Sequence, residues 1–274
     1  LNAGVPASVR DVRDRTALLV AAESNSLACV DTLVKHGAPL DVVDALERTA
    51  LMLASREGHA ALVEVLLDHG AAAGATDKFG RSALWWAVSE KNEATAVLLL
   101  RAGVPAQADD EGINPLHLAA ATDSPLLIQA LAARVEVDAQ TGDGNTALLI
   151  SAHAGSVDAL RALIDLKADV NYRNSFGDTA LIMATRESHF SVARVLLDAG
   201  ANPDARNERF ESATSIAGKG FQYVEGAEGG AAGVGNEHVL IHNCPSGANL
   251  SRNSAASGCE GIGTVADYFL NFNV

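Results

Sequence analysis

The sequence predicts an all-α solenoid of stacked helix-turn-helix units joined by hairpin-like turns. Three observations predict it. A short motif recurs every 32 or 33 residues, apolar pairs at helix spacing follow each copy, and the composition is 48% hydrophobic but only 4% aromatic. One unit of this size cannot bury its apolar face alone, so a continuous core requires several stacked units.

The repeated motif is clearest at residues 114–120, which read Asn-Pro-Leu-His-Leu-Ala-Ala. An Asn, Ser or Thr at its first position can cap a helix by accepting a hydrogen bond from a free N–H group. Pro115 suits the first turn of a helix. Degenerate copies begin at Thr16, Thr49, Ser82, Thr146, Thr179 and Ser212. We therefore expect a first helix of about two turns after each of these residues.

Each unit also carries a turn and a second helix. The turns begin near residues 11, 44, 77, 109, 141, 174 and 207, and four of them share a glycine that predicts a positive φ, namely Gly80, Gly112, Gly144 and Gly177. A helix-ending glycine follows an apolar pair in four units, at Gly37, Gly70, Gly103 and Gly200. Arg134 and Lys167 replace that glycine in two units. Either replacement costs roughly 1 kcal/mol if the backbone there is left-handed.

The turn, the Pro-Leu-His motif, the Leu-Leu pair and the glycine, at a period of 33 residues, resemble ankyrin repeats. The resemblance covers about residues 1–217 as half a repeat, six whole repeats and the start of another. It implies that His117 bonds the turn. Repeats three and four are each one residue short, so we expect altered loop geometry there. Because Leu1 falls inside a repeat, we expect the chain to be a piece of a longer protein.

The repeat pattern stops at an irregular, Gly-rich tail, residues 218–274. Residues 226–235 are nearly all Gly, Ala and Val, which is typical of a flexible linker. Apolar residues at helix spacing follow at Ile262, Val265, Ala266, Phe269 and Leu270. Two interpretations stay open: the tail folds back as a C-terminal cap on the last repeat, or it is disordered or comes from an erroneous gene prediction.

Composition excludes several classes of protein. The formal net charge of −14 argues against general nucleic-acid binding, which needs a basic surface. We find neither a signal peptide nor an apolar run near the length of a membrane span, so no membrane insertion is expected. The three isolated cysteines predict a reducing, cytoplasmic location. Among them, Cys29 is expected to be a small core residue.

The sequence predicts no catalytic, cofactor or metal site, and hence no enzyme. His238, His242, Cys244 and Cys259 have the residue types of zinc ligands but lack the two close pairs of structural sites. No Ser-His-Asp or Cys-His set is proposed, because a solenoid provides no converging pocket.

The resemblance implies instead a concave surface, built from turn tips and first helices, that holds a protein or peptide. The predicted partner-binding residues are Arg13, Arg15, Arg48, Lys78, Phe79, Arg81, Trp86, Ile113, Leu118, Asn145, Asp178 and Met183. The three tip arginines form a row suited to an acidic or phosphorylated segment. Like charges stacked in a row repel one another, so such a row favours a role in binding a partner. A charged edge that is merely exposed to solvent is the simpler interpretation. On this view, Arg48→Glu with Arg81→Glu would weaken binding and leave thermal unfolding nearly unchanged.

Behind the tips, one first-helix position is apolar in every repeat: Val20, Leu53, Trp86, Leu118, Ile150, Met183 and Ile216. Trp86 has the character of a binding hot spot, while one ring of the Trp85–Trp86 pair is expected to fill space between repeats three and four. The leading hypothesis is a monomeric, non-catalytic scaffold for protein–protein interaction. The alternative is the regulatory or substrate-recruiting arm of a larger enzyme or channel whose catalytic part lies outside this chain.

Overall fold

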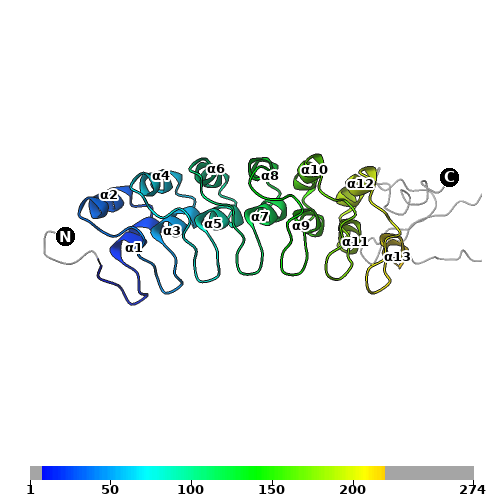
Figure 1. Ribbon diagram of the computed structural model, residues 1–274, viewed down its shortest axis with the longest axis horizontal. Coiled ribbons are helices and arrows are strands. Elements are labelled where there is room, and N and C mark those ends of the chain that lie inside the picture. Colours follow the sequence, from blue (N-terminus) through cyan, green and yellow to red (C-terminus); the bar gives the residue numbers. More distant parts are fainter. Residues whose placement is uncertain (1–7, 220–274) are drawn as a thin grey trace, which may run out of the picture.

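A computed structural model describes residues 8–219. Six helix pairs and a thirteenth helix follow one another along this range (Figure 1). The first helices of the units are α1 (Ala17–Glu23), α3 (Ala50–Arg56), α5 (Ala83–Ser89), α7 (Pro115–Ala121), α9 (Ala147–Ala154), α11 (Ala180–Arg186) and α13 (Ala213–Lys219). The second helices are α2 (Leu27–Lys35), α4 (Ala60–Asp68), α6 (Glu93–Arg101), α8 (Pro125–Leu131), α10 (Val157–Asp165) and α12 (Phe190–Asp198). The predicted all-α solenoid is confirmed. The predicted linker, cap and zinc-type residues of the tail lie outside the described residues.

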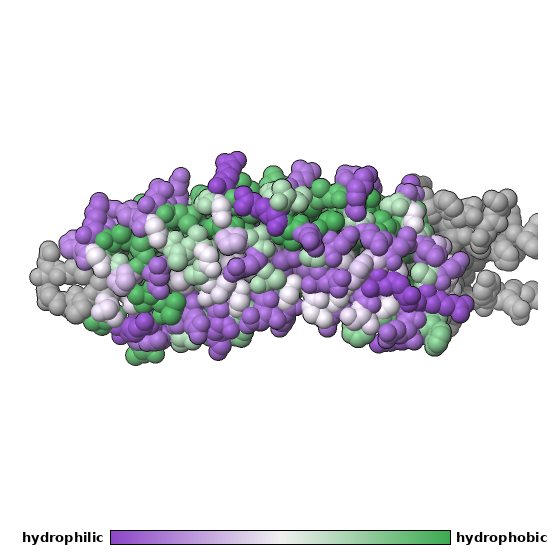
Figure 2. Space-filling model, in the orientation of Figure 1, coloured by the Kyte–Doolittle hydropathy of each residue, from purple (hydrophilic) through white to green (hydrophobic). Residues whose placement is uncertain are grey.

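The two kinds of helix form separate rows, and the turns project along one edge of the array (Figure 1). Each first helix packs against the first helices of its neighbours. The core repeats one leucine per unit, no more than 2% exposed, at Leu18, Leu51, Leu84, Leu116, Leu148 and Leu181. Buried alanines such as Ala54, Ala87 and Ala119 let the helices approach closely. Hydrophobic residues also gather on the surface of the second-helix row around α6, α8 and α10 (Figure 2), where Leu126 is 54% exposed.

Helix starts follow the predicted caps, with one exception. The side-chain oxygens of Thr16, Thr49, Ser82 and Thr179 accept the N–H of the third helical residue. Asn114 forms a full capping box with His117. Thr146 has the same extended backbone but makes no side-chain cap, and its buried hydroxyl has no hydrogen-bond partner. The first turn of α9 is therefore held by packing rather than by a cap.

The turns share one backbone geometry. In each, the first residue donates its N–H to the carbonyl of the fifth, as Asp77 does to Arg81 at 3.0 Å. The predicted positive φ of Gly80, Gly112, Gly144 and Gly177 is confirmed at 73° to 79°. Phe210 takes the same position with a φ of 61°.

A second set of bonds joins neighbouring turns into what we call the turn ladder. The second residue of a turn donates its N–H to the carbonyl of the third residue of the preceding turn. These bonds run from Lys78 to Leu46, Asp110 to Phe79, Gly142 to Glu111, Ser175 to Asp143 and Glu208 to Phe176, at 2.8 to 3.3 Å. The ladder is unbroken across the shortened repeats. In repeat three the missing residue lies between Gly103 and Asp109, and in repeat four α8 has 7 residues where the other second helices have 9.

The two residues that replace the helix-ending glycine behave differently. Lys167 has a φ of 68°, as its position predicts. Arg134 is not left-handed, because α8 ends early at Leu131 and the chain leaves the helix by another route. Its guanidinium instead donates to the carbonyl of Leu100 at 2.7 Å, at the end of α6.

We expect Lys167→Gly to raise the free energy of unfolding by about 1 kcal/mol, because glycine carries no steric penalty at positive φ. Arg134→Gly is the matched control and should destabilise, since it removes the bond to the Leu100 carbonyl and gains nothing at φ. Urea unfolding of both variants would measure the difference. Stabilisation by both substitutions would contradict this account.

The first helix pair exposes positions that other repeats bury. Cys29, expected in the core, is exposed. The equivalent side chains of the later second helices are buried, at Leu62, Thr95, Leu127, Ala159 and Val192. The prediction was wrong because, within residues 8–219, no helix pair packs on the outer side of α1 and α2. An open cleft of about 870 Å³ lies there instead.

Candidate functional site

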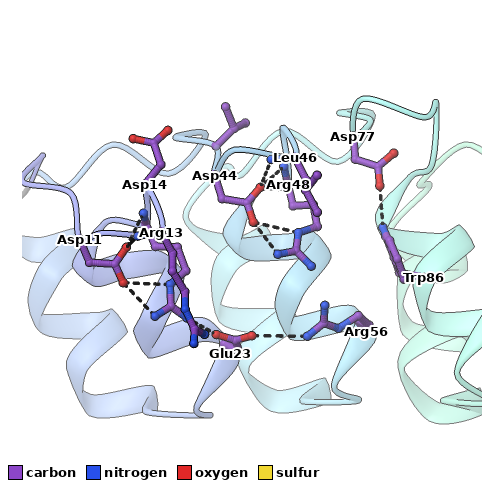
Figure 3. A network of polar contacts seen from close by, with 12 residues as sticks. Asp11, Arg13, Asp14, Glu23, Asp44, Leu46, Arg48, Arg56, Asp77 and Trp86 are labelled. Carbon is purple, nitrogen blue, oxygen red and sulfur yellow. Dashed lines mark hydrogen bonds and ion pairs between the residues drawn. The ribbon is translucent and has the colours of Figure 1, made fainter.

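The turns and the exposed sides of the first helices form what we call the turn-side face. Its three tip arginines are each paired within their own turn. Arg48 Nη2 lies 2.6 Å from Asp44 Oδ2, and Arg81 Nη2 lies 2.8 Å from Asp77 Oδ2. Arg15 pairs in the same way with Asp11 at 2.8 Å, and Figure 3 shows the pair of Asp44 and Arg48. The three arginine side chains are only 16% to 20% exposed.

This pairing corrects the argument from repulsion between stacked arginines, because a carboxylate neutralises each charge. The same carboxylates organise the backbone: Asp44 Oδ1 accepts the N–H groups of Leu46 and Arg48, both at 2.9 Å. Reversal of Arg48 and Arg81 would leave two buried carboxylates opposite new carboxylates. We therefore expect the double variant to destabilise the fold, contrary to the expectation from sequence.

The pairing also perturbs titration. Burial raises the pKa of Asp44, but the hydrogen bonds from Arg48 and Leu46 together outweigh burial and hold that pKa below its usual value. In the exposed first turn, hydrogen bonds from the backbone and side chain of Arg15 lower the pKa of Asp11 to about 2. Both carboxylates therefore stay ionised through the physiological range.

A second set of charges, on the first helices of repeats one, two and six, was missed by the sequence analysis. Glu23 accepts Arg15 Nη1 at 2.7 Å and lies 3.4 Å from Arg56 Nη2, so it bridges the first and second repeats (Figure 3). Arg186 is the equivalent residue of the sixth repeat and pairs with Asp178 at 2.9 Å. All three residues lie seven positions after an N-cap, and opposite charges at that spacing were the available signal.

The third repeat concentrates aromatic side chains around Arg81. Its guanidinium carbon lies 4.3 Å from the ring centroid of Trp86, 4.5 Å from that of Phe79 and 5.2 Å from that of Trp85. Trp86 Nε1 also donates to Asp77 Oδ2 at 3.3 Å (Figure 3). Cation–π stacking and the ion pair together hold these side chains in one conformation. Lys78 also lies over the ring of Phe79, with Nζ 5.2 Å from the ring centroid.

Both tryptophans are half-buried and meet edge to face, with ring centroids 5.2 Å apart. The Nε1 atom of Trp85 is buried without a hydrogen-bond partner, whereas that of Trp86 is bonded. Of the two residues, Trp86 is the one that packs against the hydrophobic core.

The sixth repeat holds its tip charge internally. Asp178 is 6% exposed, and its carboxylate accepts Arg186 at 2.9 and 3.1 Å and Asn207 Nδ2 at 2.7 Å. Burial raises its pKa, and the bonds from Arg186 and Asn207 more than offset this, so the pKa lies below its usual value. In the fifth repeat, Asn145 Oδ1 accepts Asn174 Nδ2 at 2.8 Å. These polar atoms already have partners within the chain.

Within the described residues, the middle of the turn-side face carries no such ion pairs. Asp109 makes the same two backbone bonds as Asp44, to the N–H groups of Glu111 and Ile113 at 3.0 and 2.8 Å. Ile113 stands where earlier repeats have arginine, so Asp109 has no counter-charge in its own turn. Behind these turns a half-buried apolar strip packs on the core, formed by Trp86, Leu118, Ile150, Met183 and Ile216. Leu53, predicted to join the strip, is 1% exposed and belongs to the core, while Val20 is 38% exposed.

His117 is a structural residue, as the resemblance implied. It is 1% exposed, its Nδ1 accepts the N–H of Asn114 at 3.1 Å, and its Nε2 lies 2.8 Å from the carbonyl of Ala139. These partners require the neutral ring protonated on Nε2. Burial lowers the pKa of His117 below 6.5, against the smaller opposite effect of the Ala139 carbonyl.

Among the described residues, no three His, Cys, Asp or Glu side chains are grouped to hold a metal ion. None of the helices in this range is both long and apolar enough to cross a bilayer.

Comparison with known proteins agrees with this architecture. A family model described as ankyrin repeats (3 copies) matches residues 1–77, 69–140 and 123–207. The crystal structure of the human ASB11 ankyrin repeat domain is 28% identical, covers 74% of this chain and 91% of that chain, and has a TM-score of 0.69. The ankyrin repeat domain of Bcl-3, a member of the IkappaB protein family, is similar in fold, at 24% identity, 74% and 93% coverage and a TM-score of 0.64. No match is found among the curated proteins. Ankyrin repeats are generally non-catalytic protein–protein interaction modules, and this chain belongs to the ankyrin repeat family.

Proposed function

We propose that the chain is a non-catalytic scaffold that holds a segment of a partner protein on its turn-side face, over the apolar strip that runs from Trp86 to Ile216. The strip carries the proposal. Its members are apolar, half-buried and supported by the core, so they present apolar area that is rigid before the partner arrives. Preorganised surface lowers the entropic cost of association.

The neighbouring groups give that strip the anatomy of an interface. Trp86 is fixed by its bond to Asp77 and by the stacked guanidinium of Arg81, and a rigid aromatic residue is a typical anchor. Arg15, Arg48 and Arg81 are satisfied by their own turns, so we give them the role of holding the face in shape. An acidic or phosphorylated partner loses its main physical support, since those arginines are already paired.

We expect Leu118→Lys to abolish capture of partners while leaving the fold intact. The substitution places a charge in the middle of the strip, at a half-exposed position where the lysine can reach solvent. Leu126→Lys is the matched control, since Leu126 is 54% exposed and lies in α8, on the second-helix row. Affinity capture from cell lysate with the three proteins would measure the effect.

Proteins that bind the wild type and the Leu126→Lys form, but not Leu118→Lys, would support the turn-side face. Loss with Leu126→Lys alone would assign binding to the second-helix row and refute the proposal. The alternative, a recruiting arm of a larger enzyme or channel, uses the same face. It would be favoured if the proteins captured in this way were substrates of a catalytic part encoded in the same reading frame.

A further inference from the structure

We propose that the bound segment is basic: a run of lysine and arginine side chains lies over the fourth and fifth turns, between apolar residues that contact Phe79 and Phe176. The inference rests on the proposed function, because it names the chemistry of the partner for the same face. It replaces the acidic or phosphorylated segment expected from the arginine row.

The fourth and fifth turns carry carboxylates without counter-charges. Asp109, Asp110, Glu111 and Asp143 lie on these two turns, and within residues 8–219 none forms an ion pair with a Lys or Arg. From Ala102 to Leu160 the chain has eight Asp and Glu residues and one basic residue, Arg134. The guanidinium of Arg134 is hydrogen-bonded to the Leu100 carbonyl, so it does not neutralise the carboxylates of these turns. The negative potential of the face is therefore strongest at its middle.

Exposed aromatic residues flank those carboxylates on the same row. The third residues of turns three to six are Phe79, Glu111, Asp143 and Phe176. The turn ladder joins them in sequence, since the carbonyl of each accepts the N–H of the next turn. Phe79 is 44% and Phe176 is 55% exposed. In this row, one aromatic side chain lies on either side of the carboxylates of Glu111 and Asp143. This arrangement fits a segment that is basic in the middle and apolar at its ends.

The spacing sets the length of that segment. Packed helices lie roughly 9 Å apart, so three steps between the turns of Phe79 and Phe176 span roughly 27 Å. An extended strand rises about 3.3 Å per residue, so about eight residues cover this distance. A short linear segment is therefore long enough to contact both aromatic residues and the carboxylates between them.

The test is a selection of displayed random peptides of about 12 residues on the full chain, followed by affinity measurement of the best binder. We expect enriched peptides with several Lys or Arg residues between aromatic or aliphatic ones. The variant Asp110→Asn, Glu111→Gln, Asp143→Asn should bind that peptide about tenfold more weakly at low salt, and the difference should shrink at high salt. The matched control, Glu64→Gln, Asp158→Asn, Asp165→Asn, changes the net charge equally on exposed second-helix positions and should bind like wild type.

The outcomes separate the two proposals. Enriched peptides that are acidic or uncharged, yet lost with Leu118→Lys, would overturn the basic segment and leave the turn-side face standing. Equal weakening by the test and control variants would also overturn it, because attraction would then follow net charge alone. An absence of peptides that depend on Leu118 would overturn both.

Discussion

Asp77→Ala is expected to lower the free energy of unfolding by about 3 kcal/mol, a large effect for one side chain in a turn. The Asp77 side chain is fully buried and accepts four hydrogen bonds, from the N–H groups of Phe79 and Arg81, from Nε of Arg81 and from Nε1 of Trp86, and Nη2 of Arg81 lies 2.8 Å from its Oδ2 as an ion pair. Its removal leaves a mostly buried guanidinium without a counter-charge, so the loss exceeds that of the bonds alone. Urea unfolding would measure it.

Asp109→Ala is the matched control, since the residue starts the next turn and keeps only the two backbone bonds. There we expect a loss of about 1 kcal/mol. Equal losses at the two positions would show that the Arg81 pair contributes nothing, and would reject the view that the tip arginines maintain the face.

Acidification from about pH 7.5 to about pH 5 is expected to destabilise the array through His117. Burial lowers the pKa of His117 in the folded state, whereas the unfolded chain titrates near 6.5. The unfolded state therefore binds the proton first as pH falls. The stability contributed by neutral His117 is complete above 6.5 and is lost as pH falls from there toward the folded pKa, by at most about 1.4 kcal/mol per pH unit.

His117→Leu should separate this effect from other titrating groups, since Leu149 occupies the same position in the next repeat. The variant is expected to be about 2 kcal/mol less stable at neutral pH, because the Asn114 N–H and the Ala139 carbonyl lose their partner. It should also show a shallower loss of stability on acidification. Identical pH slopes for the two proteins would exclude His117 as the source.

The fold could be predicted from the sequence because the same local features recur along the repeats. A cap residue at Thr49 or Asn114, a buried leucine at a fixed spacing and a glycine where φ is positive are each readable from residue type alone. Six copies in register make errors at single positions harmless. The backbone at Arg134 could not be predicted for a local reason, since the sequence does not reveal which end of a shortened unit loses the residue.

The candidate site was only partly predictable, because residue types do not reveal which charges already have partners. The arginine row was identified, but its neutralisation was not, although Asp44 and Arg48 stand at the first and fifth positions of one turn. The polar bridges from Glu23 depend on side-chain reach across repeats, which periodicity does not encode. Leu53 is apolar at the same helix position as the strip residues, and its burial depends on packing that the sequence does not show.

Because of the turn ladder, the length of the array can change in steps of one whole repeat. From the third turn on, each turn donates a backbone hydrogen bond to the turn before it, and this bond does not depend on the side chains of the two turns. Loss of residues 109–140 by recombination would bring the Gly142 N–H to the carbonyl of Phe79 in place of that of Glu111. The surface would shorten by one repeat, roughly 9 Å, and the repeats on either side would keep their structure. Loss or gain of a repeat during evolution could thus change the length of the segment that the protein binds without changing the hydrogen bonds between the remaining turns.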